Sequence, residues 1–282
     1  MQILLVVIFI AFVVLGVPIS FAGIAALPII PNSVVFTKMF NGLNSFTLLA
    51  VPLFILAANL MNEGAISDRL IDVCSACVGH VRGGLAHANI LASVVFAGMS
   101  GAAIADAGGL GAIELKAMHD AGYDDDFSLA VTGASSLVGP IIPPSVPAVV
   151  YGTVASVSIG RLFIAGAVAG AAGMCIMVYI ISRKRGYEKE GWCGLRALLH
   201  SFRRAFLSLL TVVVILGGIL AGIFTPTEAA MIATFYAIFL GFFYRTLTPK
   251  KLVQALKEAS ETTCTVMMIV CGATIFCWIL SF

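Results

Sequence analysis

Long uninterrupted apolar stretches dominate this sequence of 282 residues, and polar positions gather in a few connectors. A helix needs about 20 consecutive apolar residues to cross the hydrocarbon core of a bilayer. Stretches near this length, the second of them short, predict membrane-spanning helices over 3–27, 46–62, 162–181, 205–224, 227–244 and 262–281. The pattern therefore predicts an all-α polytopic membrane protein.

The stretch 83–158 is also apolar, but glycines and prolines interrupt it repeatedly. Unpaired backbone groups are so unfavourable in hydrocarbon that non-helical backbone survives there only where protein buries it or where it lines a wet cavity. We therefore expect this stretch to contain the working part of the molecule.

A first break, Gly98–Asp106, lies between apolar arms at 84–98 and 105–118. Neither arm is long enough to cross the membrane and leave it on the other side. This arrangement predicts a re-entrant helical hairpin with its tip near Ser100.

A second break, Gly139–Ser145, lies within an apolar run over 127–157. Pro140, Pro143 and Pro144 remove backbone donors and disfavour helix at the residues before them. The run therefore predicts a discontinuous helix, in which an extended stretch joins two half-helices. Paired broken helices are typical of transporter binding sites, because half-helix N-termini face anions and C-terminal carbonyls face cations such as sodium.

Close packing of helices is the alternative explanation for small residues. It accounts for Gly166, Gly170 and Gly173, but not for the prolines of the second break. We therefore expect the two breaks to form a sodium- or substrate-binding site. The hairpin-tip candidates are Gly98, Ser100, Gly101, Ala102, Ala103 and Asp106, and the broken-helix candidates are Gly139, Pro140, Pro143, Pro144 and Ser145.

The acidic residues in and near these segments have different expected roles. Asp106 is set in the apolar hairpin, where an ionisable residue is a functional candidate; the equal alternative is that it caps the second arm. Glu228 follows Thr225 and Pro226, a pattern typical of a helix start. Where the hairpin should exit to water, we expect a solvated face formed by Glu114, Lys116, His119, Asp120 and Asp124 to Asp126.

Composition supports the membrane assignment. Hydrophobic residues make up 60% of the chain and charged residues 11%, against about 25% charged in a soluble domain. A globule of this size cannot bury so much apolar surface. This excludes a soluble enzyme, a nucleic-acid binder and a disulfide-stapled secreted domain. Cys74, Cys77 and His80 lack a second pair at zinc-like spacing, so no metal site is expected there.

Lysine and arginine positions predict the orientation of the chain, because cytoplasmic loops carry an excess of both. The connector 182–204 contains seven of them and the segment 245–257 contains four. Two predicted spans separate these segments, so both are expected in the cytoplasm, together with the N-terminus and the ends of the hairpin. Segment 66–80 has one polar and one apolar face, which predicts an amphipathic helix lying in the membrane interface.

Several motifs together resemble the large permease subunit of TRAP transporters, the DctM-like proteins. They are Gly98-x-Ser100-Gly101-x-Ala103-x-Ala105-Asp106, Gly122-Tyr123, Gly139-Pro140-Ile141-Ile142-Pro143-Pro144-Ser145 and the segment Gly222–Ala230. The resemblance extends over essentially the whole chain. One local departure is Ala102, where family members often carry a second serine, so a sodium site here would depend more on Ser100 and on backbone carbonyls.

The resemblance implies an inverted-repeat, elevator-type secondary transporter in the bacterial inner membrane that imports organic acids by sodium symport. The substrates would be C4-dicarboxylates, sialic acid-like or other carboxylates. The partners would be a small membrane subunit and a periplasmic substrate-binding protein. No enzymatic activity is implied, and no cofactor beyond sodium as the coupling ion.

The resemblance also implies two inverted repeats, and weak symmetry relates 3–27 to 227–244 and 46–62 to 262–281. The second repeat stops at Phe282, before a hairpin of its own. We therefore expect a truncated product or fragment, or a chain completed by another. The expected regions are 1–62 (first spans), 63–158 (transport region), 159–224 (connecting spans) and 225–282 (incomplete second repeat).

Two other functions stay open. An intramembrane aspartyl protease would need a second intramembrane aspartate beside Asp106, and no predicted span contains one. A truncated, non-transporting interaction remnant is the other alternative. The sequence favours the permease subunit over both.

Overall fold

The computed structural model describes residues 2–18, 21, 32–62, 66–101, 103, 106–184 and 194–280, and the regular elements within these residues are helices. This agrees with the all-α prediction. The elements in chain order are α1 (Gln2–Val14), α3 (Asn32–Leu43), η1 (Phe46–Leu49), α4 (Ala50–Asn62), α5 (Ile66–Val78), α6 (Gly84–Ser100), η2 (Asp106–Leu110), α8 (Gly111–Asp120), α9 (Asp125–Val138), α10 (Val146–Val154), α11 (Ile159–Lys184), α12 (Gly194–Leu220), α13 (Pro226–Phe243) and α14 (Pro249–Leu280).

Four helices among the described residues are long and apolar enough to cross a membrane. A bent pair, Phe36–Leu43 and Phe46–Met61, meets the same criterion as one span with a bend of 62°. These helices confirm the polytopic prediction. The four long spans are Ile159–Ile181, Gly194–Leu220, Pro226–Phe243 and Pro249–Trp278.

The prediction of one continuous helix over 3–27 is wrong, because the helix ends near the middle of this stretch. α1 ends at Val14, and Gly16 follows with a φ of +81°. Glycine adopts this left-handed conformation readily, whereas other residues do so at a cost, so the helix stops there. Pro18 then lacks the amide hydrogen needed to continue it. Most of the later part of this predicted span lies outside the described residues.

Three stretches expected between the spans are helical. α3 occupies part of the connector before 46–62, α12 begins at Gly194, within the predicted loop 182–204, and α14 begins at Pro249. Arginine and lysine stems can cover apolar surface while their charged ends reach water. Basic residues therefore do not end these helices where the sequence pattern suggested.

The amphipathic helix predicted over 66–80 is present as α5. Leu70, Val73 and Cys74 are buried on one face, and Asp72 is exposed on the other. The buried face packs against α6 and α12. The helix is confirmed; its place in the membrane interface stays a prediction.

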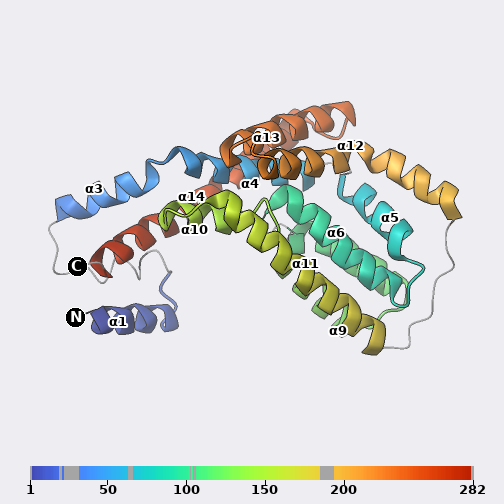
Figure 1. Cartoon of the computed structure of the whole chain (residues 1–282), viewed down its shortest axis with the longest axis horizontal. Helices are drawn as coiled ribbons and strands as arrows, with labels where there is room; N and C mark the ends of the chain where they lie inside the picture. Colours follow the sequence, from blue (N-terminus) through green and yellow to red (C-terminus); the bar gives the residue numbers. More distant parts are fainter. Residues whose placement is uncertain are drawn as a thin grey trace.

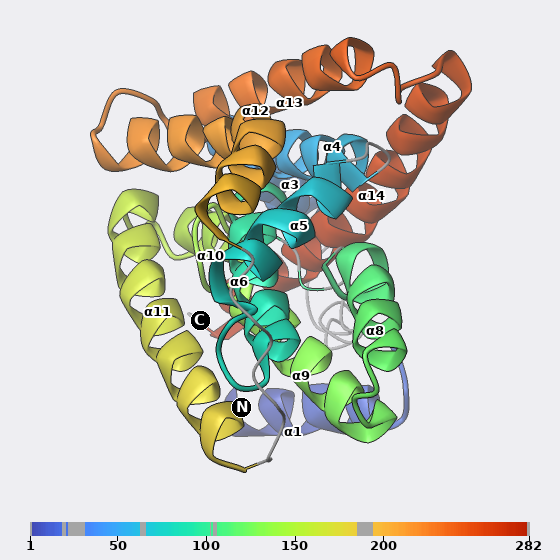
Figure 2. The same ribbon diagram turned by 90° about the vertical axis from the view of Figure 1, so that its right-hand side faces the viewer.

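The helices form two groups with α4 and α5 between them (Figures 1 and 2). α12 and α13 lie on one side, and α6, α9 and α11 lie on the other, together with α8, which is labelled in Figure 2. α4 packs against α13, and Thr234 Oγ1 donates a hydrogen bond to the carbonyl of Leu53 at 2.9 Å. Thr227 Oγ1 donates in the same way to the carbonyl of Phe46 at 3.3 Å.

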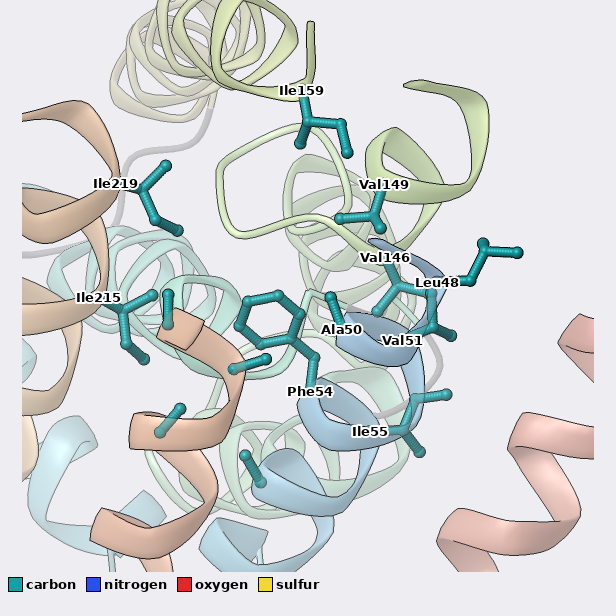
Figure 3. Packing of buried hydrophobic residues seen from close by; sticks show 14 of the residues in the cluster. Leu48, Ala50, Val51, Phe54, Ile55, Val146, Val149, Ile159, Ile215 and Ile219 are labelled. Carbon is teal, nitrogen blue, oxygen red and sulfur yellow. The ribbon is translucent and has the colours of Figure 1, made fainter. Parts of the chain in front are cut away.

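An apolar core connects these groups. Figure 3 shows the ring of Phe54 on α4 between Ile215 of α12 and the side chains of Ala50 and Val146. Phe54 is 1% exposed, and Val149 of α10 is fully buried in the same cluster. The core therefore attaches α10, the second half of the broken helix, to the body of the molecule.

Candidate functional site

The hairpin predicted around Ser100 is present as two helical arms. The first arm is α6, and the second passes through the π-helical turn η2 into α8. Gly101, directly after α6, has a φ of +61°, in the left-handed region that favours glycine. The structure thus confirms a break at the predicted tip.

The discontinuous helix is also present. α9 ends at Val138 and α10 begins at Val146. Ser145 caps α10, because its hydroxyl accepts a hydrogen bond from the amide of Ala148 at 3.1 Å. The same hydroxyl donates to the carbonyl of Pro140, which closes the turn between the half-helices. The peptide bond between Pro143 and Pro144 is cis.

The two breaks lie directly against each other. The amide of Val146 donates a hydrogen bond to the carbonyl of Gly101 at 3.4 Å. A Cβ atom placed on Gly101 would lie 2.4 Å from the carbonyl oxygen of Pro144. Backbone from segments far apart in the sequence therefore meets at a point where only glycine fits.

Helix α11 supports the second break from another side. A Cβ atom on Gly166 would lie 2.1 Å from the carbonyl oxygen of Ile141, and one on Gly170 would lie 2.3 Å from the Ile142 side chain. The packing explanation is therefore confirmed for these two glycines. Gly173 does not support it, because no atom of the described residues lies within 4 Å of such a Cβ there.

The other predicted tip residues are only partly described. Gly98 and Ser100 belong to the last turn of α6, although their side chains lie outside the described part of the structure. Ala102 lies outside the described residues, and Ala103 is half-buried. The remaining residues of the second break are buried or half-buried in the same turn: Gly139, Pro140 and Pro143.

Asp106, the first residue of η2, is buried in the interior of the molecule. It is 1% exposed, and neither carboxylate oxygen has a hydrogen-bond partner among the described residues. The capping alternative is therefore not supported, and a functional role stays a prediction.

Glu114 corrects a prediction. It was expected on a solvated face, but it is 3% exposed and its carboxyl has no hydrogen-bond partner within the described chain. The reason is the close approach of α8 to α9 at Gly111, where an added Cβ would lie 2.8 Å from the methyl group of Thr132. Glu114 lies three residues after Gly111, on the same helix face, within electrostatic range of Asp106.

The rest of the expected solvated face is largely confirmed. The exposed residues are Lys116, His119, Asp120, Asp124, Asp125 and Asp126. His119 Nδ1 and Asp125 Oδ1 are 2.8 Å apart, and this hydrogen bond raises the pKa of His119.

A buried hydrogen-bond network between α6 and α9 was missed. Ser135 Oγ donates to Asn89 Oδ1 at 2.7 Å, and Asn89 Nδ2 donates to Thr132 Oγ1 at 2.8 Å. Ser93 Oγ donates to Ser135 Oγ at 3.1 Å. Ser93 lies four residues after Asn89, and Ser135 three after Thr132, so each pair shares a helix face. That spacing within apolar arms was the signal available in the sequence.

These buried groups offer oxygen atoms. The breaks supply backbone carbonyls, and the interior supplies hydroxyls and carboxyls, which are ligands that hard cations prefer. No group of three His, Cys, Asp or Glu side chains in the described segments is placed to hold a metal ion.

Comparisons with known proteins give a consistent result. The sequence profile of the DctM component of tripartite ATP-independent periplasmic transporters matches residues 1–282. The chain is 49% identical over 248 residues to the sialic acid TRAP transporter large permease protein of Vibrio cholerae, covering 86% of this chain and 58% of that protein. It is 40% identical, with the same coverage, to the C4-dicarboxylate TRAP transporter large permease protein of Pseudomonas aeruginosa. It is 34% identical to the 2,3-diketo-L-gulonate TRAP transporter large permease protein of Escherichia coli, again covering 58% of that protein.

Proposed function

The chain belongs to the DctM component family of tripartite ATP-independent periplasmic transporters, and from that premise we propose that it serves as the large permease subunit of a sodium-coupled importer of organic acids. The family consists of multi-pass membrane permeases, not enzymes. Because the chain spans 58% of the length of the relatives compared above, activity, substrate and partners are all part of the proposal.

The observation that carries the proposal is the contact between the hairpin tip and the broken helix. Gly101 and Pro144 bring two helix interruptions together within an apolar molecule. Backbone groups at such interruptions are free to bind ions and anionic groups. We expect sodium to be held there by carbonyls of the tip, with the Ser100 hydroxyl as a further ligand.

The substrate class is proposed from the relatives. Their names denote permeases for sialic acid, for C4-dicarboxylates and for 2,3-diketo-L-gulonate. Each of these compounds carries a carboxylate. An organic acid is therefore the substrate class that best fits this chain.

The proposed partners are a small membrane subunit and a periplasmic substrate-binding protein, in the bacterial inner membrane. The family description denotes a tripartite periplasmic system, and such a system has two components besides this subunit. In this arrangement the binding protein delivers the acid to the permease, and the sodium gradient drives its import.

Transport by the complete three-component system in liposomes tests the proposal. With an inward sodium gradient, labelled sialic acid or a C4-dicarboxylate should accumulate, and a potassium gradient of equal size should give none. Ser100→Leu should abolish uptake while membrane insertion stays normal, because the larger apolar side chain fills the tip. Sodium-independent uptake would overturn the coupling, and absence of any uptake would favour the non-transporting alternative.

A further inference from the structure

The network between α6 and α9 is built around Asn89. This residue is 2% exposed, and both ends of its amide are used: Oδ1 accepts from Ser135 and Nδ2 donates to Thr132. Ser135 is fully buried and Thr132 is 4% exposed. Polar groups in such surroundings remain there only when hydrogen-bonded, so the network fixes one register of α9 against α6.

The network lies on the two helices that lead to the breaks. Ser135 is three residues before the end of α9 at Val138, from which the chain enters the turn at Gly139. On α6, Asn89 and Ser93 lie on the arm that leads to the hairpin tip at Gly101. A shift of α9 along α6 would therefore move the second break relative to the tip.

The direct contact between the breaks is weaker than the network. The hydrogen bond from the Val146 amide to the Gly101 carbonyl is 3.4 Å long, beyond the usual range for such bonds. The side-chain bonds of Asn89 are 2.7 and 2.8 Å long. The alignment of tip and break thus depends on the helix interface behind them.

We propose that Asn89 and Thr132 are positioning residues, which hold the hairpin and the first half of the broken helix as one rigid unit and thereby set the sodium affinity of the contact between the breaks. This inference rests on the proposed sodium coupling. Neither residue needs to touch the ion. Their effect on affinity comes from the relative placement of the Gly101 and Pro144 backbones.

Thr132 offers a matched pair of variants. Thr132→Val keeps the shape of the side chain but leaves Asn89 Nδ2 only the weak acceptor Met118 Sδ at 3.9 Å, whereas Thr132→Ser keeps the hydroxyl. Thr234→Val is the control, because it removes a buried interhelical hydroxyl from the pair α13 and α4, outside the network between α6 and α9. If Thr132→Val does not fold, Ser135→Ala removes the donor to Asn89 Oδ1 instead.

The readout is the half-saturating sodium concentration, that is the apparent Kd for sodium, fitted from the dependence of the unfolding temperature of the purified full-length complex on sodium concentration, with potassium as reference. We expect this concentration to rise about tenfold in Thr132→Val, which corresponds to the loss of one buried hydrogen bond. It should change less than about twofold in Thr132→Ser and Thr234→Val.

A purely structural role would lower the unfolding temperature of Thr132→Val and leave the half-saturating sodium concentration unchanged, and that result overturns the inference. A wild-type complex without sodium-specific stabilisation overturns the proposed coupling itself, so the two failures are distinguishable. A tenfold change in Thr234→Val would also overturn the inference, because the effect would not be specific to the network.

Discussion

Replacing Gly101 with alanine tests the contact between the two breaks most directly. The added methyl group would lie 2.4 Å from the carbonyl oxygen of Pro144, and the residue would keep a φ of +61°. The left-handed conformation costs a residue with a side chain about 1–2 kcal/mol. Relieving the collision by moving packed backbone adds about 1–3 kcal/mol.

Gly122 supplies a control for the backbone term. Its φ is +80°, but a Cβ atom there would have no neighbour within 4 Å among the residues that the structure describes. Gly122→Ala therefore adds the conformational strain, about 1–2 kcal/mol, without a collision. The difference between the two variants isolates the displacement of the tip from the broken helix.

The measurements are sodium-dependent uptake by the reconstituted transporter and thermal unfolding of the same preparations. Gly101→Ala should reduce uptake about tenfold or more, because displacements near 1 Å at a functional centre have effects of this size. Gly122→Ala should keep uptake within about twofold of wild type. Equal uptake by both variants would refute the argument that this contact is part of the transport site.

Three further predictions concern other parts of the chain. Glu114→Gln should leave the unfolding temperature unchanged or higher, because the buried carboxyl has no hydrogen-bond partner in the described structure; a fall of several degrees would reveal a partner that stabilises its charge. The hydrogen bond to Asp125 raises the pKa of His119. The stabilisation that this bond gives is therefore complete below the ordinary histidine pKa of about 6.5, and it is lost as pH rises through the raised pKa of His119. The loss of unfolding temperature in His119→Gln should accordingly be larger near pH 6 than near pH 9, and an equal loss would contradict this. Thr225→Ala removes the hydroxyl that accepts a hydrogen bond from the Glu228 amide at the start of α13. This variant should lower the free energy of unfolding by about 1 kcal/mol, whereas Thr225→Ser should leave it unchanged. Equal unfolding temperatures for both variants would show that the cap contributes nothing to stability.

The sequence predicted helix breaks and helix starts correctly where the type of a residue limits the backbone conformation at that residue. The break at Gly101, the turn around Pro144 and the start of α13 after Thr225 all follow from local chemistry. Glycine permits a left-handed φ, proline removes a donor, and threonine caps a helix whatever surrounds them. These residues predicted the hairpin and the broken helix before any contact between them was known.

The same reasoning failed where a neighbouring helix determines whether a side chain is buried or which hydrogen-bond partner it has. Glu114 is buried because α9 approaches α8 at Gly111, and nothing in the residues around Glu114 indicates that approach. Asn89 was overlooked because its partners lie on α9, 43 and 46 positions later in the chain. The role of a polar residue in an apolar arm can be assigned only when its partners on the facing helix are known.

The hydrogen bond between Thr234 and Leu53 joins residues 181 positions apart, and this separation has a consequence during synthesis. A ribosome adding about 5–20 residues per second needs roughly 10–40 s to cover it. Throughout that interval the face of α4 that later contacts α13 lacks its final partner, including the side chain of Phe54 in the shared core. Docking of α4 against α13 is therefore a late event in biogenesis. A substitution in α13 that slows this docking would expose an early segment of the nascent chain to membrane proteases.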